Sequence, residues 1–333
     1  MPKYITFSRN VFIPLTNICR NKCSYCGFRR NIESPDASLL NKKQVESILL
    51  RGAISKCTEA LFTFGEKPEE VKGFRELLEK IGYSNIINYL VDLCKIALEY
   101  GLLPHSNAGI LNYKELKKLK PFNASMGLML ETTGKVEAHK ESIGKNPILR
   151  LKTIENAGKL KIPFTTGILV GIGETWKDRI DSLIAIRNLH NKYGHIQEVI
   201  IQNFVPKPNT IWSKAPVPSL EEMAKTVALA RKILQSDIAI QVPPNLVSDP
   251  YTLILQGARD LGGVSPETID YINPESKWPS IIELQKMTRG IPLRERLPIY
   301  PQYIKKKWYS SYISGLIEQY ADKDGLAKRR ASL

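Results

Sequence analysis

Short runs of strand-forming residues alternate with longer amphipathic stretches along most of this 333-residue chain. The runs expected to form strands are residues 11–15, 60–64, 102–105, 124–130, 164–170, 198–204, 238–242 and 262–264. The stretches between them with helical periodicity are residues 41–55, 84–100, 112–119, 147–160, 176–192, 220–234 and 250–257. Because parallel neighbouring strands need a crossover helix, this alternation predicts an α/β fold with a parallel sheet.

Seven or eight such units favour a closed (β/α)8 barrel of the TIM type, with right-handed crossovers placing the helices outside. An open doubly wound sheet is the alternative, but no Gly-rich nucleotide fingerprint opens the first helix. We expect the barrel to occupy residues 5–265. The alternation stops near Ser265, so residues 266–333 are predicted to form a C-terminal extension that packs on the barrel, with the last ~10 residues disordered.

Three cysteines, Cys19, Cys23 and Cys26, follow the first expected strand in a CxxxCxxC pattern. In a parallel barrel, the segment after a strand lies at the face that carries the active site. Three thiolates suit an iron–sulfur cluster that leaves one iron without a protein ligand. A zinc site remains an alternative, although a second Cys pair or a close histidine is absent and the nearest histidine is His105. A chance grouping is the third interpretation.

The other cysteines and the composition indicate a protein of a reducing cytoplasm. Five cysteines are odd in number and no secretory signal precedes them, which disfavours disulfides. Cys57 and Cys94 are expected to be buried as small apolar residues. Hydrophobic residues make up 43% of the chain, yet no apolar run approaches the ~20 residues that cross a bilayer. We therefore expect no membrane association.

A net charge of +15 raises the question of nucleic acid binding. Lysine and arginine are mixed with acidic residues along the expected helices, and the tight basic runs are residues 305–307 and 328–330. Solvated helix faces account for this pattern better than a groove that follows phosphates. We expect no nucleic acid partner, and a basic metal-cluster protein that binds nucleic acid is kept as the alternative from another functional class.

The cysteine segment, with Tyr25 before its last cysteine, resembles the CxxxCxφC signature of the radical S-adenosylmethionine (radical SAM) superfamily. Residues 63–66 are similar to that superfamily's GGE-type loop, with Phe64 in place of the first glycine, and residues 167–174 are similar to its GxIxGxxE segment. The resemblance implies a 4Fe–4S cluster on Cys19, Cys23 and Cys26. It also implies that SAM, bound to the fourth iron, is consumed as a co-substrate after one-electron reduction.

The resemblance also implies which residues contact SAM. The candidates are Tyr25, Gly65, Glu66, Asn107, Glu131, Arg150, Gln202 and Asn203. Comparison with the biotin-synthase-like branch would place Glu131 on the ribose hydroxyls, Arg150 on the methionine carboxylate, and Gly65 and Glu66 on the methionine ammonium. A guanidinium is well matched to a carboxylate. The alternatives are a surface helix charge for Arg150 and loop capping for Gln202 and Asn203.

The amino-acid sequences of several segments most resemble those of the deazaflavin-forming enzymes within the superfamily. These segments are residues 12–17, 26–30, 62–68, 202–208, 257–266 and 270–275. The likeness implies the ring-closing subunit of the archaeal two-subunit enzyme. That subunit closes a hydroxybenzyl–ribitylimino pyrimidine adduct to the deazaflavin chromophore of coenzyme F420, with loss of ammonia. A carbon–nitrogen lyase of this kind would work with the hydroxybenzyl-transferring subunit and a low-potential electron donor.

Two other radical SAM activities remain open, namely that of the hydroxybenzyl-transferring subunit and that of a menaquinone-pathway relative. The catalytic residues are not apparent from the sequence, and His105 and Asp260 are the candidates. His105 could bond the uracil or phenol of the substrate, or satisfy backbone groups of a loop. Asp260, before a Gly-Gly pair, could bind ribityl hydroxyls at the barrel mouth or shape a turn.

Overall fold

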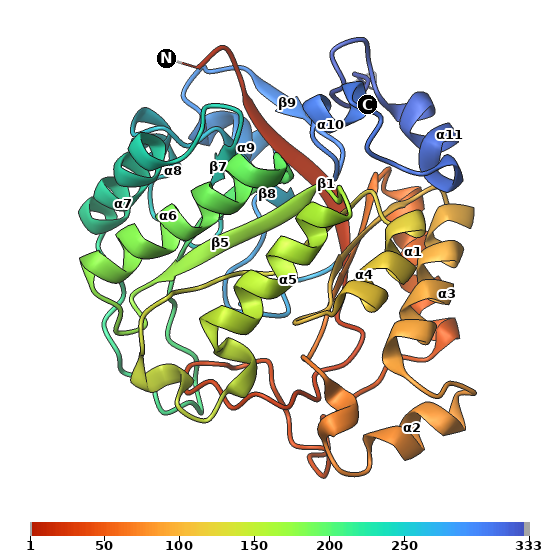
Figure 1. The fold of residues 1–333 in the computed structure, drawn as a ribbon. Helices are drawn as coiled ribbons and strands as arrows, with labels where there is room; N and C mark the ends of the chain where they lie inside the picture. The colour runs from red at the N-terminus through yellow and green to blue at the C-terminus, as the bar shows by residue number, and fades with distance from the viewer. Residues whose placement is uncertain (1, 330–333) are drawn as a thin grey trace.

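Eight parallel strands close into a barrel in the computed structural model, which describes residues 2–329 (Figure 1). The strands follow one another around the barrel in chain order, and β1 closes it by pairing with both β8 and β2. They are β1 (Ile5–Ile13), β2 (Glu59–Thr63), β3 (Leu103–Asn107), β4 (Ser125–Gly127), β5 (Phe164–Val170), β6 (Ile196–Asn203), β7 (Ala239–Gln241) and β8 (Asp260–Val264). The predicted (β/α)8 barrel is confirmed.

Helices lie on the outside of the barrel and connect successive strands (Figure 1). They are α1 (Lys42–Ile54), α2 (Phe74–Lys80), α3 (Ile86–Glu99), α4 (Tyr113–Leu119), α5 (Pro147–Lys159), α6 (Trp176–Tyr193), α7 (Leu220–Ile233) and α8 (Pro250–Leu255). Capping boxes fix several starts, as at Asn41 with Gln44 and at Thr175 with Asp178. Among residues 2–329, no helix is long and apolar enough to cross a membrane.

Short 3₁₀ segments interrupt the loops between these elements. They are η1 (Pro68–Glu70), η2 (Lys120–Phe122), η3 (Glu137–His139) and η4 (Ile143–Lys145). The segments η3 and η4 lie between β4 and α5, at the end of the barrel where the strands finish. This loop therefore faces the cysteine loop that follows β1, and it supplies several residues of the site described below.

Many polar side chains project into the barrel interior, which in this fold is normally filled by Val, Ile and Leu. Side chains alternate across a strand, so Ser8 and Asn10 of β1 point inward together. They line a cavity of about 410 Å³, as do Glu59 of β2, Thr165 of β5 and Glu198 of β6. Strand β1 begins at Ile5 and not at the predicted residue 11. The prediction started too late because the inward-facing polar residues interrupt the run of apolar residues from which the strand was predicted.

From β9 onward, the extension lies at the opposite end of the barrel from the cysteine loop (Figure 1). Its first residues lie at the cysteine end, where the Phe12 N–H donates to the Thr268 hydroxyl and Asp270 and Asn273 line the cavity. It contains β9 (Leu293–Glu295), α9 (Ile281–Met287), α10 (Pro301–Lys305) and α11 (Ser311–Tyr320). Strand β9 pairs in parallel with Ile5–Phe7 of β1, whereas β2 pairs with the later part of β1. A second apolar core, including Leu297, Tyr303 and Ile317, packs on Leu103 at the start of β3. The part of the extension from β9 onward thus covers the end of the barrel where the strands begin.

The last described residues are hydrogen-bonded to the extension. The backbone N–H of Ala327 donates to Glu295 at 3.0 Å, and that of Lys328 donates to Tyr320 at 2.8 Å. The disorder expected for the last ~10 residues stays a prediction. Residues 330–333 lie outside the described residues.

Candidate active site

Cys19, Cys23 and Cys26 lie in the loop after β1, and all three line the mouth of the barrel cavity. The backbone N–H groups of Asn21 and Glu66 donate to the Cys19 sulfur at 3.4 and 3.2 Å. The Ser142 hydroxyl donates to the Cys23 sulfur at 3.3 Å. Hydrogen bonds of this kind favour thiolates and tune the reduction potential of an iron–sulfur cluster.

The three thiols fit a multi-iron cluster better than a single zinc ion. Burial raises the pKa of Cys19 to about 11 and also raises that of Cys23, so these thiols become thiolates when a metal displaces the proton. Within residues 2–329, no three His, Cys, Asp or Glu residues lie close enough to hold one ion. A zinc site needs such convergence, whereas in a 4Fe–4S cluster each cysteine binds a different iron.

Gly65 allows the loop after β2 to lie directly against the cysteine loop. Its N–H donates to the carbonyl of Thr16 at 2.9 Å. A β-carbon at Gly65 would lie 1.9 Å from the carbonyl oxygen of Ile18 and 2.9 Å from the β-carbon of Cys19. No side chain fits at this position, so the glycine of the GGE-type loop is a steric requirement of the cysteine loop.

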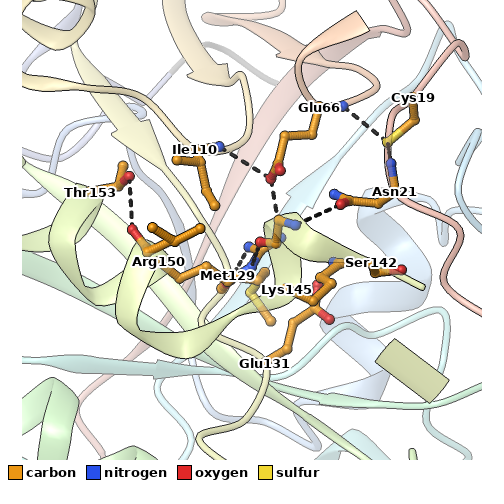
Figure 2. Close-up of polar contacts among 12 residues, drawn as sticks. Cys19, Asn21, Glu66, Ile110, Met129, Glu131, Ser142, Lys145, Arg150 and Thr153 are labelled. Carbon is orange, nitrogen blue, oxygen red and sulfur yellow. Dashed lines mark hydrogen bonds and ion pairs between the residues drawn. The ribbon is translucent and has the colours of Figure 1, made fainter. Parts of the chain in front are cut away.

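Glu66 and Arg150, both predicted to contact SAM, lie together in the structure (Figure 2). Glu66 is 4% exposed and pairs with Arg20 at 2.9 Å and with Arg150 at 3.5 Å. Arg150 is 3% exposed, and its Nε donates to the carbonyl of Gly144 at 2.9 Å. Its Nη1 donates to the carbonyl of Met129. Arg150 is therefore not a surface helix charge, and its contact with SAM stays a prediction.

Glu131 lies at the end of a short bridge to β5 and has a left-handed backbone, with φ of +67°. The Tyr25 hydroxyl donates to Glu131 Oε2 at 2.5 Å, His139 lies 3.0 Å from the same oxygen, and Lys145 pairs with Oε1. Burial alone would raise the pKa of Glu131. The Lys145 ammonium and the His139 hydrogen bond outweigh it and hold this pKa well below its usual range. The carboxylate is thus ionised and fixed in place.

His139 and Lys145 were missed by the sequence analysis. They lie in η3 and η4, where three-residue turns leave no periodic pattern to detect. The sequence does contain a hint of their role, because this loop carries basic residues between Glu131 and Arg150, the two residues predicted to contact SAM. Glu131, the ionic partner of both His139 and Lys145, was proposed as a SAM contact without reference to either residue.

Two of the three remaining residues predicted to contact SAM line the cavity, and the third bonds to a loop. Asn107 and Gln202 line the cavity. Asn107 donates to the Thr63 hydroxyl at 3.3 Å. The Asn203 amide instead donates to the carbonyl of Leu246 at 2.8 Å, which matches the loop-capping alternative for this residue.

The two candidate catalytic residues lie in different surroundings. His105 lines the cavity, bonds to Ser125 at 2.6 Å and to Asn107 at 3.2 Å, and is neutral because burial lowers its pKa to about 4. Asp260 is the first residue of β8, at the barrel end away from the cysteines, and is fully buried. It pairs with Arg296 at 2.6 Å. The expectation that Asp260 faces the barrel mouth is therefore wrong, because the strand begins at this residue.

Comparisons with known proteins agree with this site. The profile of the radical SAM superfamily matches residues 13–185. The chain is 62% identical over 330 residues to the 7,8-didemethyl-8-hydroxy-5-deazariboflavin synthase of Methanococcoides burtonii, covering 99% of this chain and 100% of that protein. It is 52% identical over 328 residues to the synthase of the same name from Archaeoglobus fulgidus, covering 98% and 99% of the two chains.

Solved structures show the same fold at low identity. The FeFe-hydrogenase maturase HydG of Carboxydothermus hydrogenoformans matches with a TM-score of 0.69 and 22% identity, over 89% of this chain and 68% of that chain. Methylornithine synthase matches with a TM-score of 0.67 and 17% identity, over 92% and 86%. Radical SAM enzymes use a 4Fe–4S cluster and SAM, the groups that the cysteine loop was predicted to hold. By sequence, fold and cysteine loop, this chain belongs to the radical SAM superfamily and, within it, to the 7,8-didemethyl-8-hydroxy-5-deazariboflavin synthase family.

Proposed function

We propose that this chain catalyses the ring-closing step of deazaflavin synthesis. The substrate is 5-amino-5-(4-hydroxybenzyl)-6-(D-ribitylimino)-5,6-dihydrouracil, and the product is 7,8-didemethyl-8-hydroxy-5-deazariboflavin, the chromophore of coenzyme F420. Ammonia is lost, so the reaction is that of a carbon–nitrogen lyase. The observation that carries this proposal is a cavity with many polar side chains directly beneath one three-cysteine loop, in a chain that matches the whole length of relatives named as the synthase.

The number of cluster loops supports a single radical step. The chain has five cysteines, and two of them, Cys57 and Cys94, are buried in the hydrophobic core. One cluster serves one barrel cavity, so the preceding hydroxybenzyl transfer is assigned to a separate radical SAM subunit. An electron from a low-potential donor starts each turnover.

The chain's own residues hold and orient the reactants. When bound, the cluster and SAM supply a carbon-centred radical that removes a hydrogen atom from the substrate. Arg150, Glu66 and Glu131 surround the cluster side of the cavity with fixed charges suited to the methionine and ribose groups of SAM. Neutral His105 faces the same cavity, where it can exchange hydrogen bonds with a uracil or phenol. The barrel walls exclude water from the radical.

The test compares two possible substrates with anaerobically reconstituted protein, SAM and reductant. One reaction contains the isolated adduct, and the other contains tyrosine and 5-amino-6-ribitylaminouracil. We expect the blue-green fluorescence of the deazaflavin from the adduct alone. Formation of the adduct from tyrosine and the diaminouracil, without turnover of added adduct, would assign the hydroxybenzyl-transfer step instead.

Two cysteine variants supply the controls for this test. The triple replacement Cys19→Ala, Cys23→Ala, Cys26→Ala is expected to lose iron, SAM cleavage and product together. The double replacement Cys57→Ala, Cys94→Ala removes buried thiols outside the loop and is expected to keep all three. Retention of SAM cleavage by the triple variant would refute a radical mechanism at this loop.

A further inference from the structure

Three buried polar side chains at the floor of the cavity lack the hydrogen bonds that such groups normally make. They are Asn10 of β1, Glu59 of β2 and Gln241 of β7, which are 1%, 5% and 8% exposed, and all three line the cavity. Among residues 2–329, the amide oxygen of Asn10 has no partner, and Glu59 accepts one hydrogen bond, from Ser8 at 2.7 Å. The Gln241 amide makes no hydrogen bond to the described residues.

A pair of glycines brings these groups to one place. Asn10 and Glu59 are register partners on neighbouring strands. A β-carbon at Gly263 of β8 would lie 2.1 Å from Asn10 Nδ2, and one at Gly262 would lie 2.2 Å from Gln241 Nε2. The amides of β1 and β7 therefore occupy space that side chains on β8 would otherwise fill. Buried polar groups without partners cost free energy, so this arrangement indicates a bound ligand that supplies the partners.

The position of the floor shows that the ligand group held there does not react. Asn10 lies three residues before the end of β1, and Glu59 lies four residues before the end of β2. At a rise of about 3.3 Å per residue, the floor is roughly 10–13 Å below the strand ends that carry the cysteine loop. A group bound at the floor therefore anchors the far end of a molecule whose other end meets the radical.

The chemistry of the floor selects a neutral, polyhydroxylated group. The Glu59 carboxylate accepts hydrogen bonds, and each amide both donates and accepts, which are the partners that neighbouring hydroxyls need. An anion would be repelled by Glu59. A cation is not favoured either, because burial raises the pKa of both Glu59 and Glu198 and so lowers the negative charge there, while Asp260 is paired with Arg296. An apolar group would leave all three side chains unpaired.

We propose that Asn10, Glu59 and Gln241 bind the ribityl arm of the substrate, with Gly262 and Gly263 making the space for the two amides. This assignment rests on the proposed function, because it takes the ribityl chain from the proposed substrate. It names the floor of the barrel as the specificity site of the enzyme, whereas the residues near the cysteines hold SAM.

The test measures binding with the holoenzyme and two probes. One probe is the deazaflavin product, and the other is the same ring system with a methyl group in place of the ribityl arm. We expect wild-type protein to bind the ribityl compound at least about tenfold more tightly, since hydrogen bonds to charged groups each contribute about tenfold to a hundredfold. Glu59→Gln, which keeps the shape, and Gly263→Ala, which displaces the Asn10 amide, are each expected to reduce this preference about tenfold.

Matched variants elsewhere in the chain separate this effect from general disturbance. Glu155→Gln changes a partly exposed carboxylate, far from the cavity lining, that pairs with surface lysines and accepts from Tyr193, and Gly315→Ala adds a methyl group in open space on α11. Both are expected to keep the wild-type preference. The proposal is overturned if wild-type protein does not prefer the ribityl compound, or if Glu59→Gln and Gly263→Ala both retain the full preference. Because the measurement is of binding, failure of ring closure alone would refute the proposed function and leave this site standing.

Discussion

Replacing Arg296 with methionine tests whether a buried ionic contact joins the extension to the barrel. Arg296 is 4% exposed and donates to Asp260 at 2.6 and 3.0 Å and to Glu198 at 3.0 Å. Methionine fills part of the same space but leaves two buried carboxylates without their cation. Breaking a buried ion pair in this way costs about 3–5 kcal/mol.

This cost converts into a measurable change in melting temperature. An unfolding entropy of about 2.1 cal/mol/K per residue gives about 0.7 kcal/mol/K for 333 residues. Arg296→Met should therefore lower the Tm by about 4–7 °C, read by calorimetry on the reduced protein. Arg294→Met is the matched control, because Arg294 pairs with Asp322 at 2.7 Å and both side chains are partly exposed. That pair contributes about 0–1 kcal/mol, so the control should lose no more than about 1.5 °C.

A second replacement distinguishes the loss of Tm caused by unpaired buried carboxylates from the loss caused by poorer packing. Asp260→Asn in the Arg296→Met background removes one buried charge while keeping the shape of the side chain. We expect the double variant to recover part of the lost Tm. Equal losses for Arg296→Met and Arg294→Met, or no recovery in the double variant, would refute the view that a buried ionic contact joins the extension to the barrel.

Three further predictions concern the cysteine loop, the SAM contacts and the buried carboxyl group of Glu198. Gly65→Ala is expected to abolish cluster loading, measured as bound iron, because its β-carbon would lie 1.9 Å from the Ile18 carbonyl oxygen. Glu131→Ala and Arg150→Ala should weaken SAM binding by about tenfold or more, in equilibrium titrations, while the cluster still assembles. Burial raises the pKa of Glu198 from 4.5 to about 7 despite Arg296. Its contribution to stability is full below about pH 4.5 and is lost as the pH rises through about 7, so Glu198→Gln should flatten the fall in Tm between pH 5 and 8.

Each of these predictions has a control or a contradicting result. Gly315→Ala should load the cluster normally, since nothing lies within 4 Å of its added methyl group. Full iron content in Gly65→Ala would contradict the steric argument. Unchanged SAM affinity in both Glu131→Ala and Arg150→Ala would remove these residues from the SAM site. A Tm that falls with pH as steeply in Glu198→Gln as in wild type would show that another group titrates.

The sequence predicted the barrel well because strands and helices alternate with clear periodicities. The strand over Phe164–Val170 matches the prediction, and α5 and α6 differ from it by one residue at one end. The first strand was predicted too short, since Ser8 and Asn10 face a cavity and not a packed core. The extension was not predicted in detail, because its short helices and β9 depend on contacts with the barrel for their stability.

The site was predictable where a motif is local and not where partners meet across loops. The cysteines and Arg150 were proposed as site residues from short segments of sequence, and the structure places all four at the same cavity. The ion pair between Arg150 and Glu66 joins residues 84 positions apart, and the contact of Tyr25 with Glu131 joins residues 106 positions apart. The position of Asp260 was predicted wrongly, because the start of β8 was placed two residues too late.

Ring closure by this chain is tested most directly by following both products of one reaction. Reconstituted protein is incubated anaerobically with the adduct, SAM and reductant, and deazaflavin and 5′-deoxyadenosine are measured together over time. We expect deazaflavin to accumulate with a matching amount of 5′-deoxyadenosine, and both to be absent with the triple cysteine variant. Formation of 5′-deoxyadenosine while the adduct remains unchanged would contradict the assignment of ring closure to this chain.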